Sequence, residues 1–257
     1  MRMTGRTNLL MALAALAISV TSCKKDSDAE PTPTPTPTEV SHNATIRLSL
    51  MFMKDTVGYT LDTVLHDSLG HALKLTAMRF YIGGGHALND DDEEVGHFEQ
   101  SILLVDADSA TNNFLLGPIY ASHIHAFHMD LGLDSAVNHT DISGAAAPLN
   151  DAGMYLGSAS AGRIFVKVIG NADVNGDGTF EQPISYTCSG DELLSEAHIH
   201  AHHDIVEGET FTGEGMVNMA VLFAGINVAT TATGTGSDAV CTRLVANLSG
   251  AIDGLGE

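Results

Sequence analysis

The feature that most constrains the fold is a succession of short apolar or alternating runs, each followed by turn residues. Between residues 44 and 53, polar and apolar side chains alternate, which is typical of a strand with one buried face. Similar runs occupy residues 44–53, 73–82, 101–105, 122–129, 163–169, 184–188, 216–223 and 243–252. Long amphipathic helical stretches are nearly absent, although 216–224 also fits a short helix. The pattern predicts an all-β fold, an antiparallel β-sandwich with long loops.

The first residues predict a lipoprotein signal peptide. Arg2 and Arg6 precede an apolar run at 9–20, which is too short to cross a bilayer and closes on Val20-Thr21-Ser22-Cys23. A small residue before a cysteine suits cleavage at that point, with lipid attached to the new N-terminal Cys23. An ordinary signal peptide with an incidental cysteine is the alternative.

The sequence predicts three successive parts of the chain. We expect a signal peptide at 1–22, a lipid-anchored Lys/Asp and Pro-Thr tether at 23–41, and one β-sandwich domain at 42–257. Alternating Pro and Thr favour an extended polyproline II spacer without a core, so the tether is expected to be disordered. The charged residues after Cys23 resemble export signals of surface lipoproteins. The protein is therefore expected to be an outer membrane lipoprotein that faces the periplasm or the cell surface.

The charge of the chain limits its partners. The formal net charge is −21, and four of the eleven Lys and Arg residues precede residue 26, whereas all 32 acidic residues follow Cys23. So acidic a domain should repel nucleic acid and anionic lipid and attract cations. We expect membrane contact through the lipid on Cys23 alone and no nucleic acid partner.

Two cysteines remain once Cys23 is assigned to the anchor. In an oxidising compartment, such a pair most often forms a disulfide, so Cys188 and Cys241 are expected to be bonded. A thiolate metal ligand is the alternative.

An acidic, glycine-containing loop resembles the first half of a calcium loop. Asp173, Asn175 and Asp177 stand at alternate positions, and a glycine occupies the sixth place. Ile184 stands where the bidentate glutamate of such a loop is expected, and Glu181 is the only nearby substitute. A tight turn between two strands explains the segment equally well.

Two histidine-rich segments are the main candidates for a metal site. In a strand, residues two apart point to the same face, so His123 and His125 form one pair and His198, His200 and His202 form a triplet. These five residues are the predicted ligand pool. The reserves, should either strand be bulged or slipped by one residue, are His128 and His203. A helix would instead pair His198 with His202, and an exposed polar face would bind no metal specifically.

Imidazole without thiolate suits copper, zinc or nickel better than calcium or magnesium. The sequence shows no phosphate loop and no Ser-His-Asp arrangement with a recognisable spacing. A binding protein is therefore expected rather than an enzyme. The best enzymatic alternative is a three-histidine zinc site with one open position.

An ordered run of landmarks resembles the MbnP-like copper-binding family. These landmarks are Leu75-Thr76-Ala77-Met78-Arg79-Phe80-Tyr81-Ile82, Leu103-Leu104-Val105-Asp106, Gly117-Pro118-Ile119-Tyr120, Phe127 to Asp134 with Asn138, Gly153-Met154-Tyr155, and Ile164-Phe165-Val166-Lys167. The resemblance implies an extracytoplasmic, β-rich protein associated with copper. Some members carry a tryptophan that a partner di-haem enzyme oxidises to kynurenine. This chain has no tryptophan, and Leu156 stands where the first one is expected, so a kynurenine ligand is excluded.

Two functions follow from these observations. The first is a lipid-anchored copper-binding protein for acquisition, storage or delivery, with a copper-handling partner protein or a di-haem enzyme as its partner. The second is a calcium-stabilised surface module that binds a protein or glycan without a specific transition-metal site.

Overall fold

The computed structural model describes residues 40–98 and 101–255. The expected signal peptide, Cys23 and the Pro-Thr segment lie outside the described residues. Within the described ranges, none of the helices is both long and apolar enough to cross a membrane.

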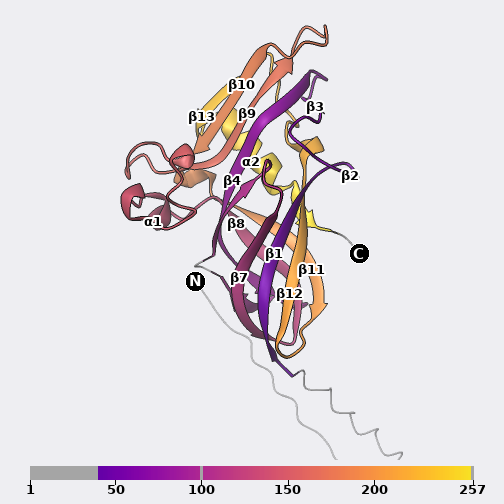
Figure 1. Cartoon of the computed structure of the whole chain (residues 1–257), viewed down its shortest axis with the longest axis vertical. Coiled ribbons are helices and arrows are strands. Elements are labelled where there is room, and N and C mark those ends of the chain that lie inside the picture. Colours follow the sequence, from indigo (N-terminus) through magenta and orange to yellow (C-terminus); the bar gives the residue numbers. More distant parts are fainter. Residues whose placement is uncertain (1–39, 99–100, 256–257) are drawn as a thin grey trace, which may run out of the picture. The chain divides into compact units, whose positions relative to one another are not determined.

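Strands dominate the described chain (Figure 1). The strands are β1 His42–Lys54, β2 Val57–Gly58, β3 Leu65–His66, β4 Ala72–Leu88, β5 Glu94–His97, β6 Ile102–Asp106, β7 Asn112–Ala121, β8 His123–Leu131, β9 Ile164–Asp173, β10 Gln182–Ser189, β11 Ser195–Asp204, β12 Glu209–Asn218, β13 Thr233–Gly236 and β14 Ile252–Gly254. The helices are α1 Ser135–Asn138, α2 Ala239–Ser249 and the short 3-10 turns η1 Ile142–Gly144, η2 Ala152–Met154, η3 Asp191–Leu193 and η4 Met219–Val221. Most of the runs that the sequence marks as strands are strands, whereas the run at 216–223 starts in β12 and continues into η4. The additional strands are β2, β3, β5, β7 and β13.

The strands form two sheets. The five-stranded sheet has the order β14-β12-β1-β2, with β7 also paired to β1. The nine-stranded sheet has the order β11-β8-β4-β9-β10-β13, and β3, β5 and β6 also pair with β4. Pairing is mostly antiparallel, but β1 with β12 and β10 with β13 are parallel. The predicted β-sandwich is confirmed, with mixed rather than purely antiparallel sheets.

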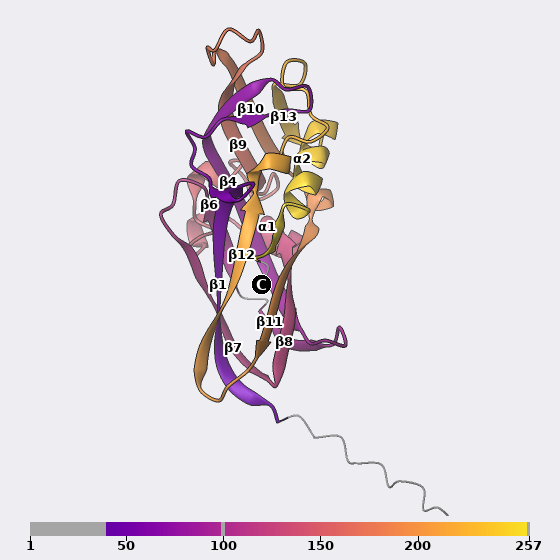
Figure 2. The ribbon, with the colours of Figure 1, turned by 90° about the vertical axis from the view of Figure 1, so that its right-hand side faces the viewer.

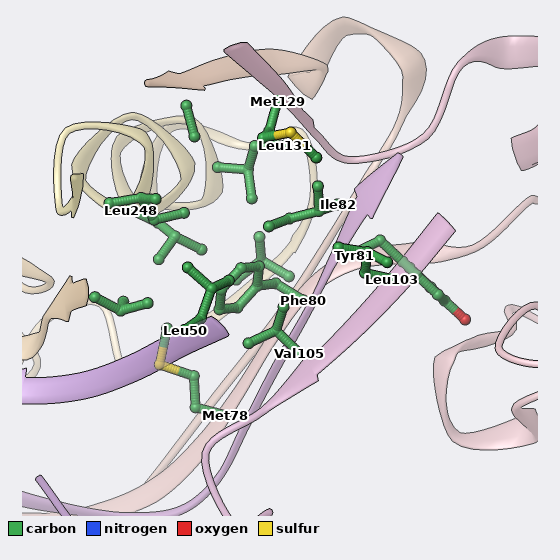
Figure 3. Close-up of a cluster of buried hydrophobic side chains, with 14 of the residues drawn as sticks. Leu50, Met78, Phe80, Tyr81, Ile82, Leu103, Val105, Met129, Leu131 and Leu248 are labelled. Carbon is green, nitrogen blue, oxygen red and sulfur yellow. The ribbon is translucent and has the colours of Figure 1, made fainter. Parts of the chain in front are cut away.

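The core lies between these sheets and α2. In β1, buried Ile46, Leu48 and Leu50 alternate with partly exposed residues, as expected for a strand with one covered face. Figure 3 shows Leu50 close to Phe80 of β4, and Leu248 of α2 within the same cluster. Residues from the two sheets thus share one apolar core.

The C-terminal run at 243–252 is a correction to the sequence prediction, because most of it is helical. Asp238 caps α2 by accepting a hydrogen bond from the Cys241 backbone N–H (2.8 Å). The buried positions Cys241, Leu244, Val245 and Leu248 follow a helical spacing. The apolar run that reads as a strand is therefore the buried stripe of a helix. Cys241 of this helix forms a disulfide with Cys188 of β10, so the predicted disulfide is confirmed.

A buried arginine organises the long connection between β8 and β9. The Arg163 side chain is fully buried and donates hydrogen bonds to the carbonyl oxygens of Val137, Asn138, Thr140 and Leu149 (2.8–3.1 Å). Its backbone N–H donates to the side chain of Asn138 (2.7 Å). The guanidinium therefore donates to carbonyls at and beyond the end of α1, where intrahelical partners run out. The landmark asparagine at 138 is thus a structural residue.

Candidate metal centre

The two histidine-rich segments are neighbouring strands. The edge strand β11 runs antiparallel to β8, as Figure 2 also shows, with His198 opposite His128 and His200 opposite Ala126. The register shifts by one residue between His200 and His203. The strand alternative for 198–203 is therefore confirmed, and the helical alternative is wrong.

The triplet on β11 has the alternation expected from its sequence. The side chains of His198, His200 and His202 are 52%, 67% and 61% exposed, whereas Ile199 between them is buried. The three imidazoles therefore lie on the accessible side of the strand.

Three histidines gather around one carboxylate, and we call Asp90, His123, His125 and His202 the Asp90 cluster. The ring centroids of His123 and His202 lie 4.4 Å apart, and those of His125 and His202 lie 5.9 Å apart. Asp90 comes from the turn between β4 and β5. Its carboxylate oxygens lie 3.5 Å from Nε2 of His123, 3.1 Å from Nδ1 of His125 and 3.7 Å from Nδ1 of His202.

The Asp90 cluster contains nitrogen atoms suited to a metal ion. Ligand atoms of Asp90, His125 and His202 all lie within 4.8 Å of one another. Nε2 of His123 and Nδ1 of His125 are buried atoms that face the Asp90 carboxylate but make no well-directed hydrogen bond in the described part of the chain. Unsatisfied buried polar atoms are costly, and a cation with open coordination positions satisfies imidazole lone pairs. The donor set therefore fits a transition-metal ion.

Two of the histidines contact a carboxylate through Nδ1, which orients their rings. Nδ1 of His123 lies 2.8 Å from Asp204, and Nδ1 of His200 lies 2.8 Å from Asp253. Burial raises the pKa of Asp253, but hydrogen bonds from His200 and from the Gly254 N–H outweigh it, so the net pKa is lowered. A carboxylate on one ring nitrogen fixes the tautomer and leaves the other nitrogen for a metal. The His200 ring lies 6.0 Å from the His125 ring, so His200 is a candidate fourth ligand.

The remaining histidines of the predicted pool and its reserves lie elsewhere. His198 packs against His128, with ring centroids 3.8 Å apart. His203 stacks on Phe211 at 4.0 Å and bonds to Glu209 (3.0 Å). The pool therefore divides: His123, His125, His200 and His202 come together, while His198 belongs to a second group.

One side of the Asp90 cluster is open to solvent. A surface hollow of about 400 Å³ is lined by His200 and His202 together with Phe211, Glu214 and Leu255, among others. A small ion or a partner protein can therefore approach two of the histidines.

The sequence alone does not single out Asp90, because residues 89–92 are an Asn/Asp-rich segment typical of a turn between two strands. The carboxylate in that segment was the available signal. Its role emerges only when the β4–β5 turn is placed against β8 and β11.

The candidate calcium loop is held by its own backbone. Asp173 accepts hydrogen bonds from the N–H groups of Gly176 and Gly178 (2.7 and 2.8 Å), and Asp177 accepts one from Thr179 (2.8 Å). The amide of Asn175 donates to Asp177 and to Glu181 (3.1 and 2.9 Å). These contacts match a tight turn, and calcium at these residues stays a prediction.

Calcium binding at this loop has a direct test. If the loop holds calcium, chelation should lower the melting temperature and added calcium should restore it, because a ligand that binds only the folded state stabilises it. Asp173→Asn should remove that response. If neither chelation nor added calcium changes the melting temperature of the unsubstituted protein, the segment is a turn that does not bind calcium.

The fold and the clusters together define a class: an all-β sandwich whose histidine groups allow a metal site. The MbnP family model matches residues 41–241, and the chain belongs to the MbnP family. Among solved structures, MbnP from Methylosinus trichosporium is similar at 15% identity and a TM-score of 0.49, covering 70% of this chain and 78% of that chain. No curated protein matches the chain. The resemblance inferred from the ordered landmarks is confirmed.

Proposed function

We propose that this protein is a lipid-anchored, extracytoplasmic copper-binding protein that acts in the acquisition, storage or delivery of copper. The observation that carries the proposal is the Asp90 cluster, in which ring nitrogens of His123, His125 and His202 converge on one carboxylate at 3.1 to 3.7 Å. Membership of the MbnP family supports copper as the ion.

The chemistry of the cluster favours copper over hard cations. Neutral imidazoles without thiolate are borderline ligands that suit copper, whereas calcium and magnesium prefer oxygen. His125 and His202 would supply the central imidazoles, with His123 and His200 completing the set and Asp90 neutralising charge. A bound ion there would be accessible for exchange, because a hollow lies beside His200 and His202. The role proposed for the site is delivery of copper to or from a copper-handling partner protein.

The proposal is tested by measuring copper directly. Chain purified without a polyhistidine tag, extracted from cell membranes and titrated with copper, should retain about one tightly bound copper ion per chain after dialysis. Elemental analysis with and without added copper gives the number. Variable, weakly held copper that dialysis removes would show that the histidines bind adventitiously and would contradict the proposal.

The lipid anchor is a separate part of the proposal. Replacing Cys23 by Ser should release the protein from the membrane fraction, because the cysteine is the acylation site of a lipobox. Fractionation followed by immunodetection measures this. Membrane residence that survives the substitution would contradict the anchor but leave the copper site untouched.

A further inference from the structure

A second histidine group lies on the nine-stranded sheet, outside the Asp90 cluster. Four histidines, one from each of four adjacent strands, stand directly opposite one another: His97 of β5 pairs with His86 of β4, His86 with His128 of β8, and His128 with His198 of β11. Their successive ring centroids are 6.4, 5.4 and 3.8 Å apart. We call this row the histidine ladder.

The β11 end of the ladder holds a compact donor set. One ligand atom each from His128, His198 and Glu196 lie within 4.8 Å of one another. Glu196 precedes His198 by two residues on β11, so both side chains point to the same face, and its carboxylate lies 3.6 Å from His198 Nε2. None of these residues belongs to the Asp90 cluster.

Two imidazole rings and one carboxylate face one another at this end of the ladder. The ring centroids of His128 and His198 lie 3.8 Å apart, and Glu196 supplies the negative charge that a divalent ion requires. Two imidazoles and one carboxylate are an established zinc donor set.

We propose that His128, His198 and Glu196 form a second metal site for a divalent ion of the zinc class, with His86 as the adjacent fourth ligand. His86 is placed for this role by its register opposite His128 and by the 5.4 Å between their rings. A hollow of about 280 Å³ beside His86, lined by Gly83, Gly84 and Gly85 among others, leaves that end of the site accessible. The site does not depend on copper binding at the Asp90 cluster.

The test isolates the second site by first disabling the Asp90 cluster. A tag-free parent chain carrying His125→Ala and His202→Ala is titrated calorimetrically with zinc chloride, and we expect about one zinc ion per chain. Adding His128→Ala and His198→Ala to this parent should weaken zinc binding about a hundredfold or more, because two of three ligands are lost. Adding His66→Ala, an exposed histidine of β3 outside both groups, should leave the affinity unchanged.

Glu196→Gln is the second variant, and it keeps the test valid if the double alanine variant does not fold. The Glu196 side chain is 59% exposed, so its substitution should spare the fold while weakening zinc binding about tenfold. Metal-free melting temperatures report whether each variant is folded. A parent chain that binds no zinc, or binds it equally well after Glu196→Gln and after His128→Ala with His198→Ala, would overturn the second site.

Discussion

Replacing His125 and His202 together by alanine should lower copper affinity by about a hundredfold or more. The two residues supply the facing imidazoles of the Asp90 cluster, with ring centroids 5.9 Å apart on adjacent strands. The remaining His123, His200 and Asp90 then hold the ion with an incomplete donor set, from which water displaces it more readily. Competition against a copper chelator of known affinity measures the change.

His198→Ala is the matched control for this prediction. It lies on the same strand as His202 and is similarly exposed, but its ring packs against His128 rather than in the Asp90 cluster. We expect its effect on the tightest copper to be less than about threefold. Equal losses from His198→Ala and from the double variant would show that the histidines act as one diffuse surface and would contradict a defined site.

Asp90→Asn refines the same experiment. The carboxylate lies within 3.1 to 3.7 Å of three imidazoles, so it contributes either a ligand or a neutralising charge. We expect a loss of about tenfold, smaller than the loss from the imidazoles.

Replacing Arg163 by methionine should lower the free energy of unfolding by about 3–5 kcal/mol, because several buried carbonyl oxygens lose a charged donor at about 1–3 kcal/mol each. Methionine fills much of the same volume but leaves four carbonyl oxygens, those of Val137, Asn138, Thr140 and Leu149, without the guanidinium that satisfies them. Chemical denaturation followed by circular dichroism gives the change.

Arg47→Met is the control for this second prediction. Arg47 carries the same side chain on β1 and donates to Asn113 at 2.8 Å, but that contact is exposed. We expect its loss to cost less than about 1 kcal/mol, because exposed polar contacts are weak. If Arg163→Met remained within 1 kcal/mol of the unsubstituted protein, the buried arginine would not organise the β8–β9 connection.

Local patterns in the sequence account for most of the secondary structure. Alternation around Ile46 and Leu48 identifies β1, and the spacing of His198, His200 and His202 identifies one exposed face of β11. Both depend only on the twofold repeat of a strand, which a few consecutive residues specify. The strand predicted at 243–252 is wrong, because a short apolar segment fits both the strand period and the helix period. Only its contacts in the folded protein distinguish the two. The structure shows α2 packed against the core through Leu244 and Leu248.

The sequence by itself determined the family, the sandwich, the disulfide and the two histidine-rich segments, because motifs, alternation and leftover cysteines are local or countable features. Only the tertiary structure decided which side chains meet. Strand order places β11 beside β8, the register shift after His200 divides the histidines, and the β4–β5 turn brings Asp90 to three of them. Sheet order and register arise from contacts between residues far apart in the chain, so no local pattern specifies them.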